Sequence, residues 1–261
     1  DHRDLHSFPT RRSSDLSTAT GLTFGNELLD TLGSNDYSQL AGDPTGYVFG
    51  TETGAIVNAG DLAVTPGQSL TLLGGQVINT GQLAASGGEV LVMAVPGENR
   101  VRLSQDGSLL GLELETLPDT APTAAFTPTT VPALLTGAGA LGMATDITVN
   151  SDGTVSLSGS SLQIPTDAGT AIISGQLEAD SGNIGVLGEQ IALVGATVDA
   201  SGDAGGGTVL IGGDELGNGT VPNAAATIID ENSVVQADAR DIGSGGKIVA
   251  WGTDLLRSAG Q

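Results

Sequence analysis

The chain of 261 residues contains no cysteine, which excludes a disulfide framework, a thiolate metal site and thiol-based catalysis. Its two histidines, His2 and His6, both lie at the N-terminal end, so a Ser–His or Cys–His nucleophile in the body of the chain is excluded too. Aromatic residues make up 3% of the sequence, so the core must be narrow and filled by Val, Ile, Leu and Ala. No apolar run reaches the ~18 residues typical of a membrane-spanning helix.

Basic residues are scarce as well. Eight Lys and Arg stand against 30 Asp and Glu, which gives a formal net charge of −22 at pH 7. A surface of this sign repels nucleic acid and anionic membranes. We therefore expect no nucleic-acid partner and no membrane insertion.

Residues 1–16 differ from the rest of the chain. They contain no glycine, both histidines, three Arg and three Asp, and thus no net charge. They lack the apolar stretch of a signal peptide and resemble a translated sequencing-adapter read; a natural disordered basic tail is the alternative. We expect this segment to be a non-native tail that lies outside the fold.

Glycine is abundant, at 41 residues, and it punctuates a repeat. The segment 54–70 recurs 21 residues later as 75–91. Aligned pairs are Gly54/Gly75, Val57/Ile78, Asn58/Asn79, Gly60/Gly81, Leu62/Leu83, Gly67/Gly88 and Leu70/Leu91. A short period rich in Val and Ile, with glycine at the corners, predicts a β-solenoid of about 21-residue coils.

Weaker copies follow downstream. Each has an apolar pair, a Gly-rich corner and an alternating apolar strand. The first apolar position precedes that strand by 11 to 13 residues; the equated positions are Val77, Ile172, Val198 and Val235. A constant coil with variable corners indicates stacked rungs with loop insertions.

The expected organisation follows from these patterns. Residues 17–50 form a lead-in, and residues 51–117 form regular coils. Residues 118–143 form a Pro/Gly-rich excursion, because four of the ten prolines fall at its start. Residues 144–261 return to coils. Only 27–32 and 132–143 could hold a helical turn.

Several segments resemble large secreted proteins of the filamentous-haemagglutinin type, especially cyanobacterial members exported by two-partner secretion. The matching segments occur in order: Pro96–Gln105, Val149–Gly159, Gly205–Asp214, Gly217–Ala224, Ala237–Ala239 and Gly245–Trp251. The resemblance covers nearly all of 17–261. It implies a right-handed parallel β-helix, export through a cognate outer-membrane β-barrel transporter, and a secreted or cell-surface location in a Gram-negative-type bacterium.

One feature departs from that family. The secretion domain's Asn-Pro-Asn-Gly type of motif is absent. We therefore expect the fragment to begin downstream of that domain, to be cut from a larger protein at both ends, and not to be recognised by the transporter itself.

Carboxylates supply the remaining candidate sites. Four acidic pairs could serve glycoside hydrolysis, which needs two carboxylates facing one cleft: Asp199/Asp203, Asp214/Glu215, Asp230/Glu231 and Asp238/Asp241. Acidic glycine-rich loops at 201–205 and 212–215 could instead bind calcium. Because Asp beside Gly is ordinary turn chemistry, we interpret these residues as solvated turn residues.

Three further features have structural interpretations. Gly137, Gly139 and Gly142 match G-x-G-x-x-G but lack a βαβ context, so no dinucleotide site is expected. Asn58 and Asn79 lie one coil apart, and we expect them to stack as an amide ladder. We interpret Trp251 as a core or corner packing residue rather than a sugar platform.

We therefore expect a non-enzymatic β-helical shaft of a secreted adhesin acting in surface attachment, with no catalytic, metal or cofactor site. Its partners would be the transporter, through an upstream domain, and surface or carbohydrate ligands. The alternatives are a polysaccharide-active β-helix enzyme using an Asp pair, and a calcium-stabilised surface-layer module. An ice-binding solenoid is disfavoured, because no Thr-x-Thr row repeats at 21 residues.

Overall fold

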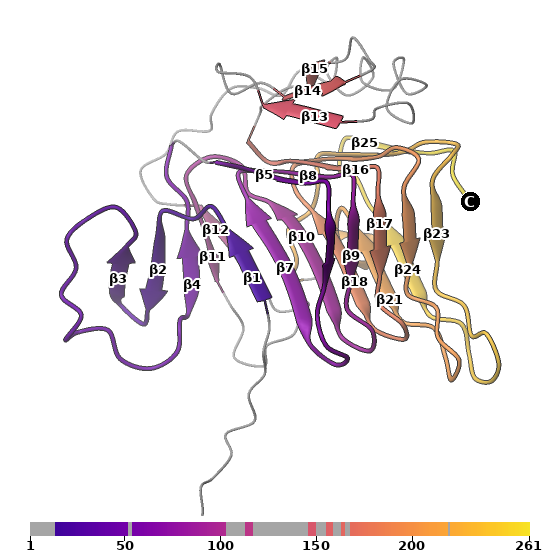
Figure 1. Ribbon diagram of the computed structural model, residues 1–261, viewed down its shortest axis with the longest axis horizontal. Coiled ribbons are helices and arrows are strands. Elements are labelled where there is room, and N and C mark those ends of the chain that lie inside the picture. The colour runs from indigo at the N-terminus through magenta and orange to yellow at the C-terminus, as the bar shows by residue number, and fades with distance from the viewer. Residues whose placement is uncertain are drawn as a thin grey trace, which may run out of the picture.

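The computed structural model describes residues 14–51, 54–102, 113–116, 146–149, 155–158, 163–164, 168–218 and 220–261. This part of the chain is almost entirely β-strand (Figure 1). The one helical element within it is a 3₁₀ turn at Glu215–Gly217, and none of its helices is long and apolar enough to span a membrane.

Three parallel sheets make up most of the fold. Sheet 1 contains β1 (Ser14–Ser17), β7 (Ser69–Gly74), β10 (Glu89–Ala94), β18 (Asn183–Leu187), β21 (Thr208–Ile211) and β24 (Lys247–Ala250). Sheet 2 contains β5 (Ala55–Asn58), β8 (Gln76–Asn79), β16 (Thr170–Ile173), β19 (Gln190–Leu193), β22 (Ala226–Ile229) and β25 (Leu255–Ser258). Sheet 3 contains β6 (Asp61–Ala63), β9 (Gln82–Ala84), β17 (Gln176–Glu178), β20 (Thr197–Asp199) and β23 (Val234–Gln236).

The chain visits these sheets in a fixed order. Each pass, which we term a coil, runs from sheet 1 to sheet 2 to sheet 3 and then returns to sheet 1 beside its starting strand; β7, β8 and β9 are followed in this way by β10. The result is an all-β molecule with parallel sheets of many strands. The arrangement is compatible with the predicted β-solenoid.

The pairing register measures the coil. Ala55 pairs with Gln76 and Gln176 pairs with Thr197, a step of 21 residues, whereas Ser69 pairs with Glu89, a step of 20. The predicted pairs Val57/Ile78, Asn58/Asn79 and Leu62/Leu83 are therefore confirmed.

The predicted pair Leu70/Leu91 is wrong by one residue, since Leu70 pairs with Val90. A slip of one residue moves a side chain to the opposite face of the strand. Leu70 and Val90 both lie in the interior cluster, whereas Leu91 lies in a second cluster outside it. Burial therefore sets this register, and the shorter corner accommodates it.

The interior is filled by alternate residues of all three sheets. Leu72, Val77, Leu83, Val92 and Ile173 are each fully buried there, together with equivalent aliphatic residues of later coils. No aromatic side chain belongs to this cluster. The narrow aliphatic core expected from the low aromatic content is confirmed.

Two long insertions leave the coils at the same corner, between sheets 1 and 2. The first spans 18–54, between β1 and β5, and the second spans 95–169, between β10 and β16. Together they form a five-stranded antiparallel sheet of β2 (Gly21–Phe24), β3 (Glu27–Asp30), β4 (Gly46–Val48), β11 (Asn99–Arg102) and β12 (Glu113–Thr116). The second insertion also forms a three-stranded sheet of β13 (Asp146–Val149), β14 (Val155–Ser158) and β15 (Gln163–Ile164).

These insertions correct the predicted organisation. Coils stop after β10 and resume at β16, so Asn99–Arg102 and Asp146–Val149 are antiparallel strands where coils were expected. Alternating apolar residues suit both kinds of strand, so the pattern alone could not separate them. The excursion predicted at 118–143, with its possible helical turn at 132–143, lies outside the described residues.

Two local expectations also fail. The possible helical turn at 27–32 contains strand β3, because Gly25, at a φ of +62°, lets the chain fold back as a hairpin against β2. The boundary expected after residue 16 falls inside strand β1, because Ser14–Ser17 pairs with Leu70–Leu73 of β7. All four residues of β1 are exposed, so this strand is held mainly by its backbone pairing.

Candidate functional site

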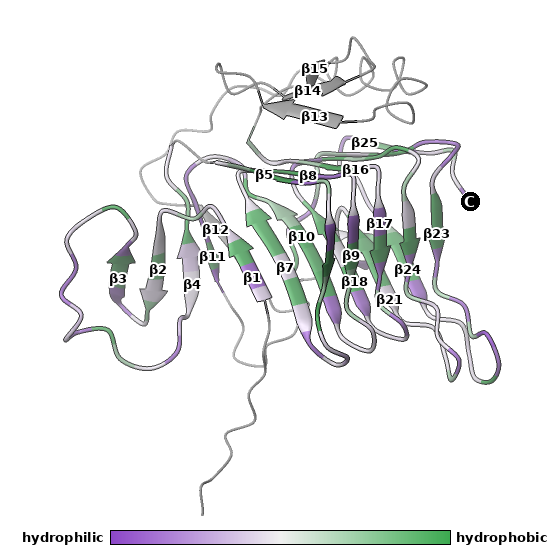
Figure 2. Ribbon diagram, viewed as in Figure 1, coloured by the Kyte–Doolittle hydropathy of each residue, from purple (hydrophilic) through white to green (hydrophobic). Residues whose placement is uncertain are grey.

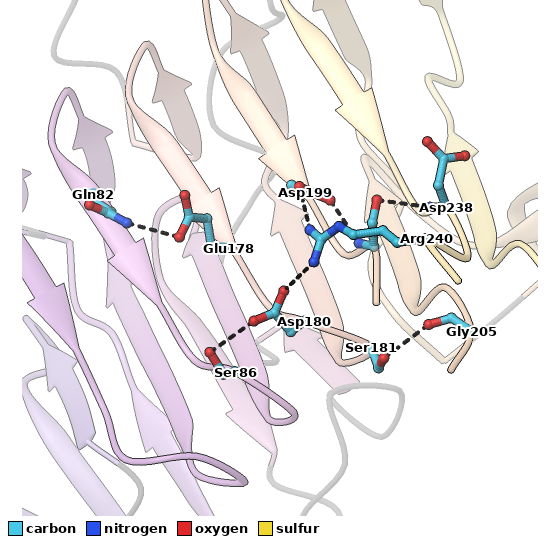
Figure 3. A network of polar contacts seen from close by, with 10 residues as sticks. Gln82, Ser86, Glu178, Asp180, Ser181, Asp199, Gly205, Asp238 and Arg240 are labelled. Carbon is cyan, nitrogen blue, oxygen red and sulfur yellow. Dashed lines mark hydrogen bonds and ion pairs between the residues drawn. The ribbon is translucent and has the colours of Figure 1, made fainter. Parts of the chain in front are cut away.

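Charged and polar side chains form a network on the outer face of sheet 3 and the corner that follows it (Figure 3). The Gln82 amide donates to Glu178 at 2.9 Å, and the Ser86 hydroxyl donates to Asp180 at 3.2 Å. Arg240 completes the network by reaching across coils. Its guanidinium lies 3.0 Å from Asp180 and 3.0 Å from Asp199.

Strand alternation positions these residues. Leu177 and Val198 point into the core, so their neighbours Glu178 and Asp199 face outward. The sheet register places Glu178 directly beside Asp199 in the next coil. Arg240 comes from the loop after β23, which folds back along this face; the Arg240 backbone N–H donates to the carbonyl of Gly202 at 2.9 Å.

Asp199 is the most constrained carboxylate of the network. Its Oδ1 accepts from the Ser201 backbone N–H at 2.7 Å, and its Oδ2 accepts from Arg240. Partial burial alone would raise the pKa of Asp199, but the hydrogen bonds from Ser201 and Arg240 and the positive charge of Arg240 together lower it. Asp199 therefore stays ionised, as an ion-pair partner.

The other predicted members of this region do not join Asp199. Asp203, Asp238 and Asp241 are exposed. Their contacts run through the backbone: the Asp203 carbonyl accepts from Asp241 N–H at 3.3 Å, and Asp238 N–H donates to the Ser201 hydroxyl at 2.9 Å. The sequence pairs Asp199/Asp203 and Asp238/Asp241 thus mark loops that pack together through main-chain bonds.

The pair Asp214/Glu215 binds a lysine. Lys247 Nζ lies 2.9 Å from Asp214 and 3.5 Å from Glu215. Asp214 also accepts from the Glu215 backbone N–H at 2.7 Å, and that bond, followed by Lys247, lowers the pKa of Asp214. A loop considered for calcium therefore holds a cationic side chain of its own.

The pair Asp230/Glu231 divides between interior and solvent. Asp230 is 8% exposed, and its Oδ1 accepts from the Gly195 N–H at 2.9 Å and from the Ser233 hydroxyl at 2.6 Å. Glu231 is exposed. Asp230 thus caps the corner of a neighbouring coil and has little free capacity for substrate.

The predicted amide ladder is confirmed. Asn58 Nδ2 donates to Asn79 Oδ1 at 2.7 Å, and the two residues are paired in register. Each amide also donates to the carbonyl two residues ahead, at Gly60 and Gly81. Because Asn79 is fully buried, the ladder satisfies polar groups that water cannot reach.

Trp251 lies at a corner, as predicted. A Cβ built at Gly217 would lie 3.0 Å from Cζ2 of Trp251, and one at Gly213 would lie 3.1 Å from its Cδ1. Both glycines have positive φ, at +67° and +144°. The indole therefore packs against two glycine backbones of the 212–225 loop, which leaves no open ring face there for a sugar.

Sequence reasoning missed the cations that organise these corners. Arg240 and Lys247 each join residues from different coils, and Asp180 was not among the candidate pairs. The available signal was scarcity: with 8 basic residues in the chain, a lone Arg or Lys beside a glycine-rich acidic corner is a natural ion-pair partner.

The chemical capacity of the region is limited to ion pairing and hydrogen bonding across coils. Among the described residues, no group of three or more His, Asp or Glu side chains is placed to hold a metal ion. The one pocket that stands out in that part of the chain, between sheet 1 and Val221, encloses about 10 Å³, room for about one water molecule. The G-x-G-x-x-G segment at 137–142 lies outside the described residues.

Comparison with known proteins gives no relative: no family model, no curated protein and no solved structure matches the chain.

Proposed function

We propose that the coils form a right-handed parallel β-helix and serve as a non-enzymatic shaft segment of a large secreted adhesin exported by two-partner secretion. The observation that carries this proposal is the repeated passage through three parallel sheets at a step of 20 or 21 residues. Stacked coils that each contact only their neighbours make an extended, quasi-one-dimensional body.

The polar contacts support a mechanical role. Asn58 binds Asn79 of the next coil, Asp230 binds the backbone of Gly195, and Arg240 joins two other coils. These bonds hold one coil to another and leave the carboxylates engaged. Rigid projection of weak binding elements, which add through avidity, is the function that suits such a body.

The outer face of sheet 3 is our candidate for surface or carbohydrate contact. None of its outward residues is buried, and they include Gln82, Gln176, Glu178, Thr197 and Gln236. Amides, hydroxyls and carboxylates on one flat face can form many weak hydrogen bonds with polar surfaces. Export through a cognate outer-membrane transporter and a cell-surface location come from the family resemblance alone.

The alternatives remain predictions without a favouring observation. A polysaccharide-active enzyme needs two carboxylates facing a cleft, and the four described pairs are each exposed or engaged locally. A calcium-stabilised module would melt at higher temperature when millimolar calcium is added. Circular dichroism melts with and without calcium test that module directly.

A one-coil deletion tests the shaft. Residues 176–196 run from Gln176 to the residue before its register partner Thr197, so their removal deletes one coil and joins equivalent positions. Spin labels at Ala63→Cys and Gln236→Cys, exposed positions in one row of sheet 3, should move closer by about 4.8 Å.

The control deletes 176–186, which breaks the register and should abolish cooperative folding. Cells that display the parent adhesin with the one-coil deletion should attach to a test surface as strongly as before. If attachment is lost while the shortened chain still folds, the segment carries a specific site and the shaft proposal fails.

A further inference from the structure

The outer face of sheet 2 is buried along four consecutive coils. Ile78, Ile172, Ala192 and Ile228 are paired in one row, and each is 0–2% exposed. The second outward row, Gln76, Thr170, Gln190 and Ala226, is 1–7% exposed. Something covers this face, because the same outward positions on sheet 3 are open to solvent.

The cover is separate from the described core. The four aliphatic residues belong to neither of the two hydrophobic clusters, whose sheet 2 members are inward residues such as Val77, Ile173 and Ile191. The Thr170 hydroxyl is buried without a hydrogen-bond partner. A buried polar atom in this state indicates a dry contact with apolar groups rather than trapped water.

A comparable cover lies on sheet 1. Leu73, Leu91 and Met93 face away from the interior, and the second cluster packs them with Phe49 and Val101. Phe49 belongs to the first insertion and Val101 to the second, and both insertions leave at the corner between sheets 1 and 2. Insertions at this corner therefore fold over an outer face that carries apolar residues.

The three-stranded sheet of the second insertion has the pattern that sheet 2 requires. Its register pairs Ile147 with Leu157, and pairs Val149 with Val155, which also pairs with Ile164. Because alternate residues of a strand lie on opposite faces, these five apolar residues share one face. The other face carries Thr148, Ser156 and Gln163.

We propose that residues 146–164 dock their apolar face on the outer face of sheet 2 and form a built-in cover of that sheet. The chain returns from β15 to β16, a strand of sheet 2 itself, so the cover is tethered at the surface it occupies. Figure 1 shows β13 and β14 next to the edge of the molecule along which β5, β8, β16 and β25 run.

Because the chain has no cysteine, paired cysteines test this contact in the full chain. Ile172→Cys would be combined in turn with Cys at each apolar-face position (147, 149, 155, 157 and 164) and at each polar-face position (148, 156 and 163). Mild oxidation should give intrachain disulfides with one or more of the first set and none with the second. Disulfides that join two chains would identify a second copy as the occupant and overturn the proposal, as would equal yields from both sets.

Alkylation of Ile172→Cys alone gives a second readout. Its reaction with a maleimide should be slow, and adding Leu157→Asp should make it at least tenfold faster while the β-rich circular dichroism spectrum is unchanged. Gln176→Cys, which is exposed, supplies the reference rate. An alkylation rate that Leu157→Asp leaves unchanged in the folded chain would show that another segment covers sheet 2.

Discussion

Sheets 2 and 3 are built by the same coils and still differ on their outer faces. Outward residues of sheet 2 are buried, as Ile172 is, whereas their counterparts on sheet 3, such as Gln176, are exposed. Figure 2 shows the same contrast in composition: β7 and β10 of sheet 1 are mostly hydrophobic, whereas β9 and β17 carry hydrophilic residues. The inward residues are thus set by the coil, and the outward residues by what packs on each sheet.

The largest effect should come from the inward side of β17. Leu177→Ala removes a fully buried side chain and should cost about 2–5 kcal/mol of unfolding free energy. Gln176→Ala, one residue away but exposed, should change it by less than about 0.5 kcal/mol. Urea titration of both variants measures the difference, and equal losses would show that β17 is not anchored in the core.

A smaller loss should follow from breaking the amide ladder. Asn79→Ala removes the acceptor for Asn58 and the donor for Gly81 in a fully buried position, at a cost of about 1–3 kcal/mol. Thr80→Ala is the matched control, because Thr80 is half-buried and its hydroxyl makes a longer bond, 3.3 Å to the Asn58 carbonyl. If both variants melt at the same temperature, the ladder is not a stabilising element.

The seat of β1 on the molecule can be followed through Tyr47. Burial, followed by the charge of Asp15 and the 3.2 Å hydrogen bond to it, raises the pKa of Tyr47 to about 12. The folded pKa is above the ordinary value of 10.0, so this stabilisation is present below pH 10.0 and is lost as pH rises through about 12.

A Tyr37→Phe chain has Tyr47 as its one tyrosine, and absorbance at alkaline pH then reports Tyr47 alone. Asp15→Asn should move that titration to lower pH. A titration that is insensitive to Asp15→Asn would mean that the N-terminal strand does not hold this position in solution.

The smallest effect should come from the open face of sheet 3. Arg240→Gln breaks ion pairs with Asp180 and Asp199 that lie at the surface, where solvent and salt screen them. We expect a slight decrease in melting temperature at low salt and none at 1 M salt. A large, salt-independent loss would show that the loop after β23 is part of the core structure.

Acid should act on the same contact. Because the pKa of Asp199 is lowered in the folded chain, its contribution is present above the unfolded pKa and is lost as pH falls through the folded value. Arg240→Gln should therefore flatten the acid limb of the stability curve, measured by thermal melts between neutral and acidic pH.

The inward pattern was predictable because it repeats at the coil period. Leu62 and Leu83 align in sequence and pair in space, as do Asn58 and Asn79. Later coils were aligned less well: Val198 and Val235 were equated with Ile172, although both lie in sheet 3, in register with Leu177. Corners of unequal length shift the apparent period, and side-chain type alone does not identify the sheet.

The insertions and ion pairs lay beyond the repeat. Strands β2 and β11 are far apart in sequence and share one antiparallel sheet through β4, a long-range arrangement that local alternation does not encode. Arg240 contacts Asp180 across a separation of 60 residues. Such contacts depend on where loops return, and one sequence holds no local signal for that.

The shared corner between sheets 1 and 2 has a consequence for how such a chain can change. Both long insertions enter there, and the strands on either side still pair in register with the neighbouring coils, as Ala171 does with Val77. That corner behaves as a socket: new modules can be grafted into it without altering the pitch of the rod. The short corner Gly188–Glu189, at the equivalent place between β18 and β19, is therefore a natural point at which to display a foreign domain at a defined height.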